Sequence, residues 1–214
     1  YTKFLDEVDH ISSYFLNVEP FTNAENINLF YVDDINTDLE CIHVSISGNS
    51  DCSSPHSGSW SSNDCRVISC SSTKSFNLAS ACPNLGTNTP NEEVIVLFNS
   101  DYHGGTGGSF SKVTHYPASV GIATHEFGHS FGKLADEYTD RYYDDWFDAE
   151  NYHNCDTSSC GSWSDLEGTD CIKGCSTNEF YRSIDTSIMR NYDSSDSYGL
   201  LNERLIEEKL REYR

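Results

Sequence analysis

The chain has 214 residues, enough for one domain with a hydrophobic core, and 36% of them are hydrophobic. Thirteen basic residues against thirty-four acidic ones give a formal net charge of −21. A surface of this charge repels nucleic acid and anionic membranes, and no apolar run is long enough to span a bilayer, so we expect neither nucleic-acid binding nor membrane insertion.

The N-terminal half predicts one helix and three strands. Apolar residues recur at helical spacing near its start: Phe4, Val8, Ile11 and Phe15. Branched and aromatic side chains favour strands at residues 27–34 (INLFYVDD) and 41–47 (CIHVSIS). Residues 47–91 are rich in Ser, Asn, Gly and Cys and predict a long loop region held by disulfides. A continuous apolar run predicts a buried strand at residues 92–100 (EEVIVLFNS).

The C-terminal half begins with a glycine-rich segment, residues 101–109 (DYHGGTGGS), which predicts either a flexible rim beside a cleft or a plain surface turn. Pro117 suits the first turn of a helix, so we expect a helix to follow it. Residues 139–180 show no clear period, and residues 185–195 (DTSIMRNYDSS) predict a turn. Residues 199–213 predict a closing amphipathic helix, with one side formed by Leu201, Leu205 and Leu210.

Nine cysteines without a C-x-x-C motif predict disulfides, and hence a secreted or cell-surface protein. The second group of cysteines is expected to pair internally: Cys155, Cys160, Cys171 and Cys175. An alternative for this group is a structural zinc ion, although the gaps are not those of zinc knuckles or ribbons. Internal pairing of the first group would leave one odd cysteine among Cys41, Cys52, Cys65, Cys70 and Cys82.

The strongest chemical signal is GIATHEFGHSFGKLADEY, residues 121–138. Residues on a helix advance by about 100°, so His125 and His129 point the same way and can bind one zinc ion. Glu126 lies about 60° from His129, within reach of a water molecule at the ion. Zinc acidifies that water, and the glutamate takes its proton and later passes it to a leaving amine. The helix is expected to stop near Gly132, and Asp136 then offers a third ligand.

The five-residue pattern alone also occurs on helices whose histidines are ordinary polar residues. The longer stretch HEFGHSFGKLADEY resembles the zinc-binding signature of the IgA-peptidase family of metallopeptidases, among the metzincin-like zincins. Common metzincins carry the third ligand one position earlier, where this chain has Ala135. The resemblance is to the variant in which an aspartate, here Asp136, is the ligand. It extends to VIVLFNSDYHGGTGG, to the opening FLDEVDHISSYFLNVEPF, and to DTSIMRNY, which is similar to a Met-turn with Met189.

The resemblance covers most of the chain and is weakest at residues 47–91 and 139–180. It implies a single α+β domain over residues 1–214, with a mixed twisted sheet beside the zinc helix. An N-terminal lobe of about residues 1–132 and a smaller C-terminal lobe of about 133–214, with the Met-turn and closing helix, would flank the cleft. By analogy with other zincins, the strand at 94–99 or the loop after it would pair with the main chain of an extended peptide.

The implied function is a secreted zinc endopeptidase that acts on a protein or peptide. Its metal ligands would be His125, His129 and Asp136, and its general base would be Glu126. The alternative is an idle zincin scaffold with a binding, structural or assembly role outside the cell. Calcium is a further cation to consider, because acidic residues cluster without EF-hand spacing at Asp144, Asp145 and Asp148 and at Asp193 and Asp196.

Further residues receive less specific expectations. Glu137 is an alternative to Asp136 as the ligand, and Tyr138 is expected to pack beneath the site or to orient a ligand. Tyr192 follows Met189 by three residues, whereas some metzincins place a tyrosine two residues after the methionine and use it at the metal. A role for Tyr192 in the transition state is therefore an open alternative. Two loop histidines are candidates for a place near the substrate: His103 and His115.

Overall fold

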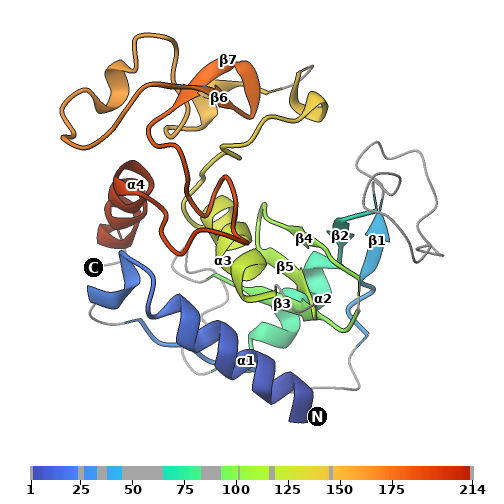
Figure 1. Ribbon diagram of the computed structural model, residues 1–214. Coiled ribbons are helices and arrows are strands. Elements are labelled where there is room, and N and C mark those ends of the chain that lie inside the picture. The colour runs from blue at the N-terminus through green and yellow to red at the C-terminus, as the bar shows by residue number, and fades with distance from the viewer. Residues whose placement is uncertain are drawn as a thin grey trace.

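The computed structural model describes residues 2–23, 27–32, 38–44, 65–82, 93–100, 102–115, 119–144 and 147–212. These residues form an α+β fold, as expected, with helices on both sides of short strands (Figure 1). The α-helices are α1 (Thr2–Phe15), α2 (Ser72–Ala79), α3 (Ser119–Ser130) and α4 (Leu200–Arg211). The strands are β1 (Ile42–Val44), β2 (Val67–Ser69), β3 (Ile95–Phe98), β4 (Gly105–Thr106), β5 (Ser111–Thr114), β6 (Ile172–Cys175) and β7 (Thr177–Arg182).

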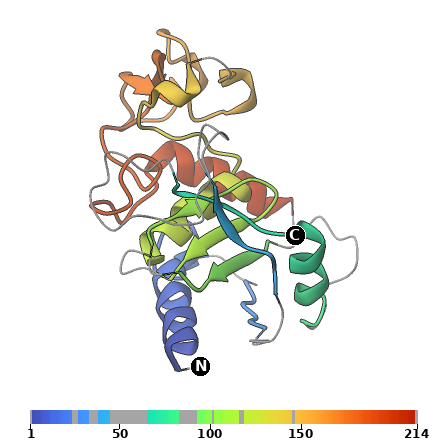
Figure 2. The ribbon, with the colours of Figure 1, turned by 90° about the vertical axis from the view of Figure 1, so that its right-hand side faces the viewer.

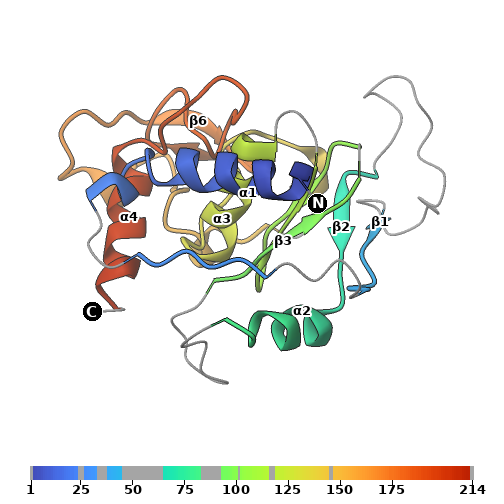
Figure 3. The same ribbon diagram turned by 90° about the horizontal axis from the view of Figure 1, so that it is seen from below.

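A small mixed sheet supports α3. Its strand order is β3-β5-β4, with β3 parallel and β4 antiparallel to β5. The antiparallel pair β1–β2 lies next to β4. A hydrogen bond of 3.2 Å joins them, from the backbone N–H of Gly105 in β4 to the carbonyl of Arg66, the residue before β2. Helices α1 and α2 lie on opposite sides of these strands (Figure 3). The sheet therefore holds the glycine-rich segment around β4 against α3.

The N-terminal helix α1 is confirmed, and it anchors the core beneath α3. Phe15 stacks on Phe21 with ring centroids 4.1 Å apart, and Phe15 meets Phe127 of α3 edge to face at 4.7 Å. All three rings are buried. Full burial of a phenylalanine side chain stabilises a fold by roughly 1.5–3 kcal/mol, so this cluster fixes the helix that carries the histidines.

The segment after α3 leads to the β6–β7 hairpin, which lies at the opposite end of the molecule from the N-terminus of α1 (Figure 2). Two disulfides hold it, Cys155–Cys175 and Cys160–Cys171, so the expected pairing within the second cysteine group is confirmed. Helix α4 follows as predicted, with Leu201 buried and Leu205 and Leu210 partly buried. Its most buried apolar side chain is Ile206, which the expected leucine stripe did not include.

A third disulfide joins Cys41 to Cys70, and Cys65 is disulfide-bonded too. These disulfides are compatible with an oxidising, extracellular environment. Among the residues described, helices that combine the length and apolar character of a membrane span are absent.

Several sequence predictions were wrong. Residues 27–32 form no strand, because Leu29, Phe30 and Tyr31 remain 47–58% exposed and no neighbouring strand covers them within the described part of the chain. Strand propensity reflects packing on a half-buried surface, which this segment lacks. The loop predicted for 47–91 contains β2 and α2, and the start of α2 is capped by Ser71, whose side chain accepts from the N–H of Lys74.

Strand β5 had not been predicted. Residues 33–34, 45–47, 92 and Pro117 lie outside the described residues. β1 and β3 confirm strands within the ranges 41–47 and 92–100, although both are shorter than predicted and only Val96 of β3 is buried. Residues 188–190 form a turn, as expected for residues 185–195.

Candidate metal centre

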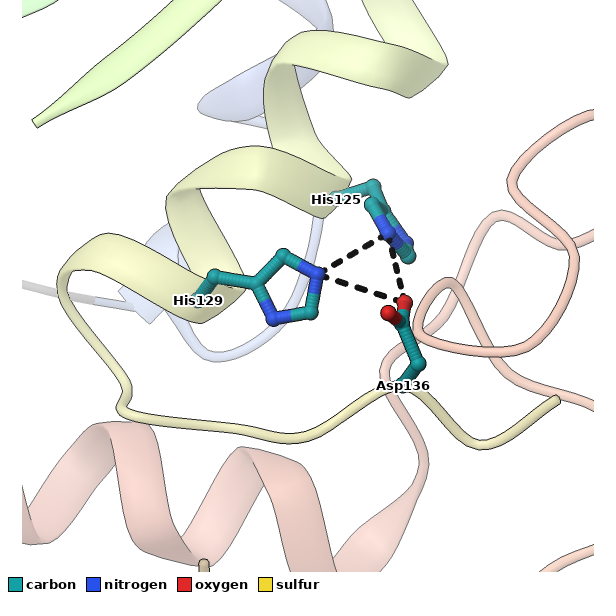
Figure 4. A group of neighbouring side chains, drawn as sticks. All are labelled: His125, His129 and Asp136. Atoms are coloured by element: carbon teal, nitrogen blue, oxygen red, sulfur yellow. Dashed lines mark hydrogen bonds and ion pairs between the residues drawn. The ribbon is translucent and has the colours of Figure 1, made fainter. Parts of the chain in front are cut away.

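Helix α3 presents its two histidines toward one point. His125 and His129 extend from successive turns, and Asp136 reaches the same point from the segment after the helix (Figure 4). The Nε2 atoms of the histidines are 3.1 Å apart. Oδ1 of Asp136 lies 3.0 Å from Nε2 of His125 and 3.2 Å from Nε2 of His129. Three potential ligand atoms therefore form a nearly equilateral triangle.

Backbone carbonyl groups orient both imidazole rings. Nδ1 of His125 lies 2.9 Å from the carbonyl oxygen of Ile188, and Nδ1 of His129 lies 2.7 Å from that of Leu134. A carbonyl oxygen only accepts, so each Nδ1 carries the proton and donates it. The Nε2 atom of a neutral imidazole then presents a lone pair to the centre of the triangle. Hydrogen bonds of this kind commonly hold metal-binding histidines in position.

The donor set fits a metal ion. Among the described residues, Oδ1 of Asp136 has no hydrogen-bond donor although it is buried. Two neutral imidazoles and a carboxylate thus point lone pairs at one another, an arrangement that requires a positive charge between them. Ligand atoms about 2.0–2.2 Å from a tetrahedral zinc ion lie roughly 3.3–3.5 Å apart, close to the observed separations.

The electrostatics of the metal-free group lead to the same conclusion. Burial disfavours a charged imidazole, but the Asp136 carboxylate outweighs burial and raises the pKa of His129 to about 9. Burial alone would raise the pKa of Asp136, yet the charge of His129 and contacts to both histidines lower it well below its usual value. The site therefore attracts a proton when no metal ion neutralises it.

The chain reversal after α3 brings Asp136 back to the histidines. Helix α3 ends at Ser130, and the N–H of Leu134 donates to the carbonyl of Gly128 at 3.1 Å. The residue in the left-handed region is Lys133, with φ 52°, rather than Gly132. Gly132 is needed for close approach instead, because a Cβ atom there would lie 2.9 Å from the carbonyl oxygen of Gly128. The helix therefore ends near Gly132, as expected, but Lys133 takes the left-handed conformation and Gly132 allows the close approach.

Glu137 points away from the histidines. It is fully buried, and its carboxylate accepts hydrogen bonds from Asn154, Asn202 and Ser187. Its backbone N–H donates to the carbonyl of Met189 at 2.9 Å. Glu137 is therefore not part of the triangle.

Within the described residues, His125, His129 and Asp136 are the only group of three or more side chains close enough to share a metal ion. A calcium site at the acidic clusters is accordingly not supported at Asp144, Asp148, Asp193 and Asp196, and Asp145 lies outside the described residues.

Glu126 lies beside the triangle under the glycine-rich segment. The backbone N–H of Gly107 donates to its carboxylate, and a Cβ atom at Gly105 would collide with that carboxylate. Burial raises the pKa of Glu126, while the nearby histidines oppose this shift. Residues 105–108 also line the pocket, so the segment lies beside a cleft, as the rim alternative expected, whereas its flexibility stays a prediction. Glycine is needed at two positions of this segment, because a Cβ atom at Gly105 would collide with Glu126 and one at Gly107 would collide with His129.

A pocket of about 420 Å³ opens over the triangle and Glu126. His103 and Tyr192 line one part of it, and the Tyr192 hydroxyl lies 2.7 Å from Nε2 of His103. The Tyr192 ring meets the His125 ring edge to face at 5.2 Å. His115 does not line this pocket; its Nδ1 lies 3.4 Å from a carboxylate oxygen of Glu7 on α1.

Two further candidates lie close to the histidine helix. Tyr138 stacks on the ring of His125 with centroids 6.4 Å apart and an interplanar angle of 17°. Met189 is fully buried against α3, where a Cβ atom at Gly128 would collide with its sulfur. The absence of a side chain at Gly128 therefore lets the turn at Met189 pack directly against the histidine helix.

Sequence reasoning missed several residues of the pocket, and two of them make polar contacts at the site. Tyr143 donates its hydroxyl to Oδ2 of Asp136, and Arg66 forms an ion pair with Asp140 at 2.9 Å at the pocket wall. Neither residue belongs to a spacing pattern, because tertiary folding alone brings it to the site.

The IgA Peptidase M64 family model matches residues 2–158. The match contains the complete His125–Asp136 motif and ends before Met189. A comparison with curated proteins finds no matching relative. Because the match covers more than half of the sequence, the chain belongs to the IgA peptidase M64 family, a family of metallopeptidases.

Proposed function

We propose that the chain is a secreted zinc endopeptidase with His125, His129 and Asp136 as metal ligands and Glu126 as the general base. The observation that carries this proposal is the triangle of three lone-pair atoms beside a buried glutamate, at the floor of an open pocket. The side chain of His129 is 20% exposed, which supports access of a substrate to the site. The disulfides and the family assignment support the extracellular peptidase character.

The metal ligands and Glu126 would have separate roles in the reaction. Zinc held by the triangle would polarise the peptide carbonyl and acidify the attacking water. Glu126 would accept a proton from that water and return it to the departing amine. Its burial supports this role, because burial moves the pKa of a carboxyl group upward, toward the neutral range in which it both takes and gives a proton.

The peptide main chain would lie along the glycine-rich segment. Residues 105–108 line the pocket, whereas β3 does not contribute to it. A backbone without side chains permits the close approach of another chain. We therefore assign main-chain contact to the loop after β3, the second of the two places expected from sequence.

Tyr192 would contribute a hydrogen bond to the reacting carbonyl. Its ring lies beside His125, and its hydroxyl is held by His103. A donor placed where negative charge develops stabilises the transition state. We assign the turn at Met189 to the Met-turn of metzincin-like zincins. In this proposal, residues of about 1–132 and 133–214 form two lobes around the cleft.

The test is the activity of Glu126→Gln against a diverse peptide library. Gln preserves the size of the side chain and removes its basicity, so zinc content and thermal stability should hold. Peptide hydrolysis should fall by roughly 10²- to 10⁴-fold, the usual contribution of general acid–base catalysis.

The matched control is Glu208→Gln, which makes the same change at an exposed position of α4 and should retain full activity. Equal turnover by wild type and Glu126→Gln would remove Glu126 from the role of base. A zinc-loaded wild type that cleaves no peptide would replace the enzyme proposal with the idle-scaffold alternative.

A further inference from the structure

The two oxygens of the Asp136 carboxylate have different surroundings. Oδ1 faces the two Nε2 atoms at 3.0 and 3.2 Å. Oδ2 accepts a hydrogen bond from the hydroxyl of Tyr143. The carboxylate is 5% exposed, so little water competes for either oxygen. One oxygen thus faces the histidines, and the other is occupied by the phenol.

Tyr143 is itself held in place. It ends the short helix η2 (Arg141–Tyr143), where its N–H donates to the carbonyl of Asp140 at 3.0 Å. Its carbonyl accepts from the N–H of Phe147 at 3.0 Å, and the two rings pack edge to face at 6.2 Å. Backbone and ring contacts thus fix the phenol independently of Asp136.

A second tyrosine lies between this residue and a ligand ring. The rings of Tyr138 and Tyr143 have centroids 6.5 Å apart at an interplanar angle of 54°. On its other side the ring of Tyr138 stacks on that of His125. Tyr138 therefore packs between Tyr143 and a ligand ring.

We propose that Tyr143 is a positioning residue that holds Asp136 in a one-oxygen orientation toward the metal ion. The inference rests on the proposed metal site but not on catalysis. With Oδ2 occupied by the phenol, the carboxylate offers Oδ1 alone, and the three-atom site keeps an open position. Without the phenol, the carboxylate is free to rotate and to offer both oxygens.

The first measurement is the zinc affinity of Tyr143→Phe, determined by competition with a chromophoric chelator. Loss of a hydrogen-bonding partner behind a metal ligand typically weakens metal binding about 10- to 100-fold, and we expect a loss in this range. Tyr102→Phe removes a phenol hydroxyl outside the pocket, at a residue that is 44% exposed, and should bind zinc like the wild type.

The second measurement distinguishes positioning from a general contribution to folding. Cobalt(II) absorbs visible light more strongly in four-coordinate sites than in sites of higher coordination number. Tyr143→Phe should therefore weaken the cobalt absorption as Oδ2 joins the coordination, whereas Tyr102→Phe should leave the spectrum unchanged.

Two outcomes would overturn the proposal. One is a zinc affinity and a cobalt spectrum of Tyr143→Phe that equal those of the wild type. The other is a lower unfolding free energy in the presence of a chelator with unchanged metal binding, which would make the hydrogen bond merely structural. Either result could occur together with a loss of activity in Glu126→Gln. The Glu126 variant therefore tests the proposed function, and the Tyr143 variant tests only the positioning of Asp136.

Discussion

Asp136 and Glu137 are neighbours in sequence, but they lie in two regions with opposite chemistry. Asp136 faces the pocket, where Oδ1 meets only the lone pairs of two histidines. Glu137 faces the interior behind the pocket, where side-chain amides and a hydroxyl donate to its carboxylate. A shell of donors satisfies a buried charge, whereas a shell of acceptors requires a cation.

The interior region also positions the pocket. Asn154, Ser187 and Asn202 come from three separate segments and converge on Glu137. The backbone N–H of Glu137 donates to the carbonyl of Met189, and the carbonyl of the preceding residue, Ile188, accepts a hydrogen bond from His125. Glu137 therefore ties α4 and the methionine turn to the segment that carries Asp136.

The largest effect on folding should come from Glu137→Ala. The change leaves several buried donors without an acceptor, and each such group costs about 1–3 kcal/mol. We expect the unfolding free energy to fall by roughly 3–5 kcal/mol, measured by urea denaturation of the metal-free protein. Asp136→Ala should destabilise the metal-free protein less, because the hydroxyl of Tyr143 donates to Oδ2 of this carboxylate but Oδ1 has no donor. A smaller loss of unfolding free energy in Glu137→Ala than in Asp136→Ala would contradict the view that Glu137 is the carboxylate with the complete set of donors.

Addition of zinc should reverse that order. A ligand present at about 1,000 times its Kd stabilises the folded state by about 4 kcal/mol. Wild type should gain this amount, and so should Glu137→Gln, which keeps an acceptor and leaves the triangle intact. Asp136→Ala should gain far less at the same zinc concentration, since the loss of a ligand exceeds the 10- to 100-fold effect of losing a supporting contact. Equal zinc-induced shifts in Asp136→Ala and wild type would remove Asp136 from the site.

Sequence and structure agree best where one local pattern decides the outcome. The i, i+4 spacing of His125 and His129 and the reversal toward Asp136 were predictable, because a helix and a turn impose that geometry. The internal pairing of the second cysteine group was predictable from its separation along the chain. Tyr143 and the donors around Glu137 were not predictable, because only the tertiary fold brings them together.

The strands show the same limit. β3 was predicted from its apolar run, whereas the exposed residues 27–32 have equally strong strand propensity but no partner among the described strands. The two residues of β4 carry no side-chain pattern at all. Their position depends on close packing against Glu126, which no propensity reports.

The disulfide Cys155–Cys175 joins the two regions and should have the next largest effect. Cys155 follows Asn154, a donor to Glu137, and Cys175 precedes Ser176, whose N–H donates to the carbonyl of Asp136 at 2.8 Å. Replacing both cysteines by alanine opens a loop with a sequence separation of 20 residues. We expect a loss of about 3 kcal/mol in unfolding free energy, measured by thermal or urea denaturation.

The paired change Cys160→Ala and Cys171→Ala is the control for this effect. It opens a loop with a separation of 11 residues away from both carboxylates. Both double variants should lose stability, but zinc affinity should fall only when Cys155–Cys175 is removed. A fall of equal size in both would contradict a specific link to Asp136.

A third carboxylate, Glu93, belongs to no metal-binding group among the described residues and lacks a full shell of donors. Burial raises its pKa to about 7, although Ser130 donates to it and Lys133 is nearby. Within the described residues, Oε1 of Glu93 has no hydrogen-bond partner. A partly buried carboxylate that lacks enough donors is stabilised when it binds a proton and becomes neutral.

This difference should appear in the pH dependence of stability. The folded-state pKa of Glu93, about 7, lies above the unfolded value of about 4.5. The folded state therefore binds the proton more tightly, and the contribution of this group is present below pH 4.5 and is lost as pH rises to 7. Glu93→Gln mimics the protonated form, so it should remove this slope and raise the unfolding free energy at pH 8 by about 1–3 kcal/mol relative to wild type. Glu208→Gln on the exposed face of α4 should leave the slope unchanged. A Glu93→Gln profile parallel to that of the wild type would mean that Glu93 is already ionised at pH 5, like a carboxylate with a complete donor shell.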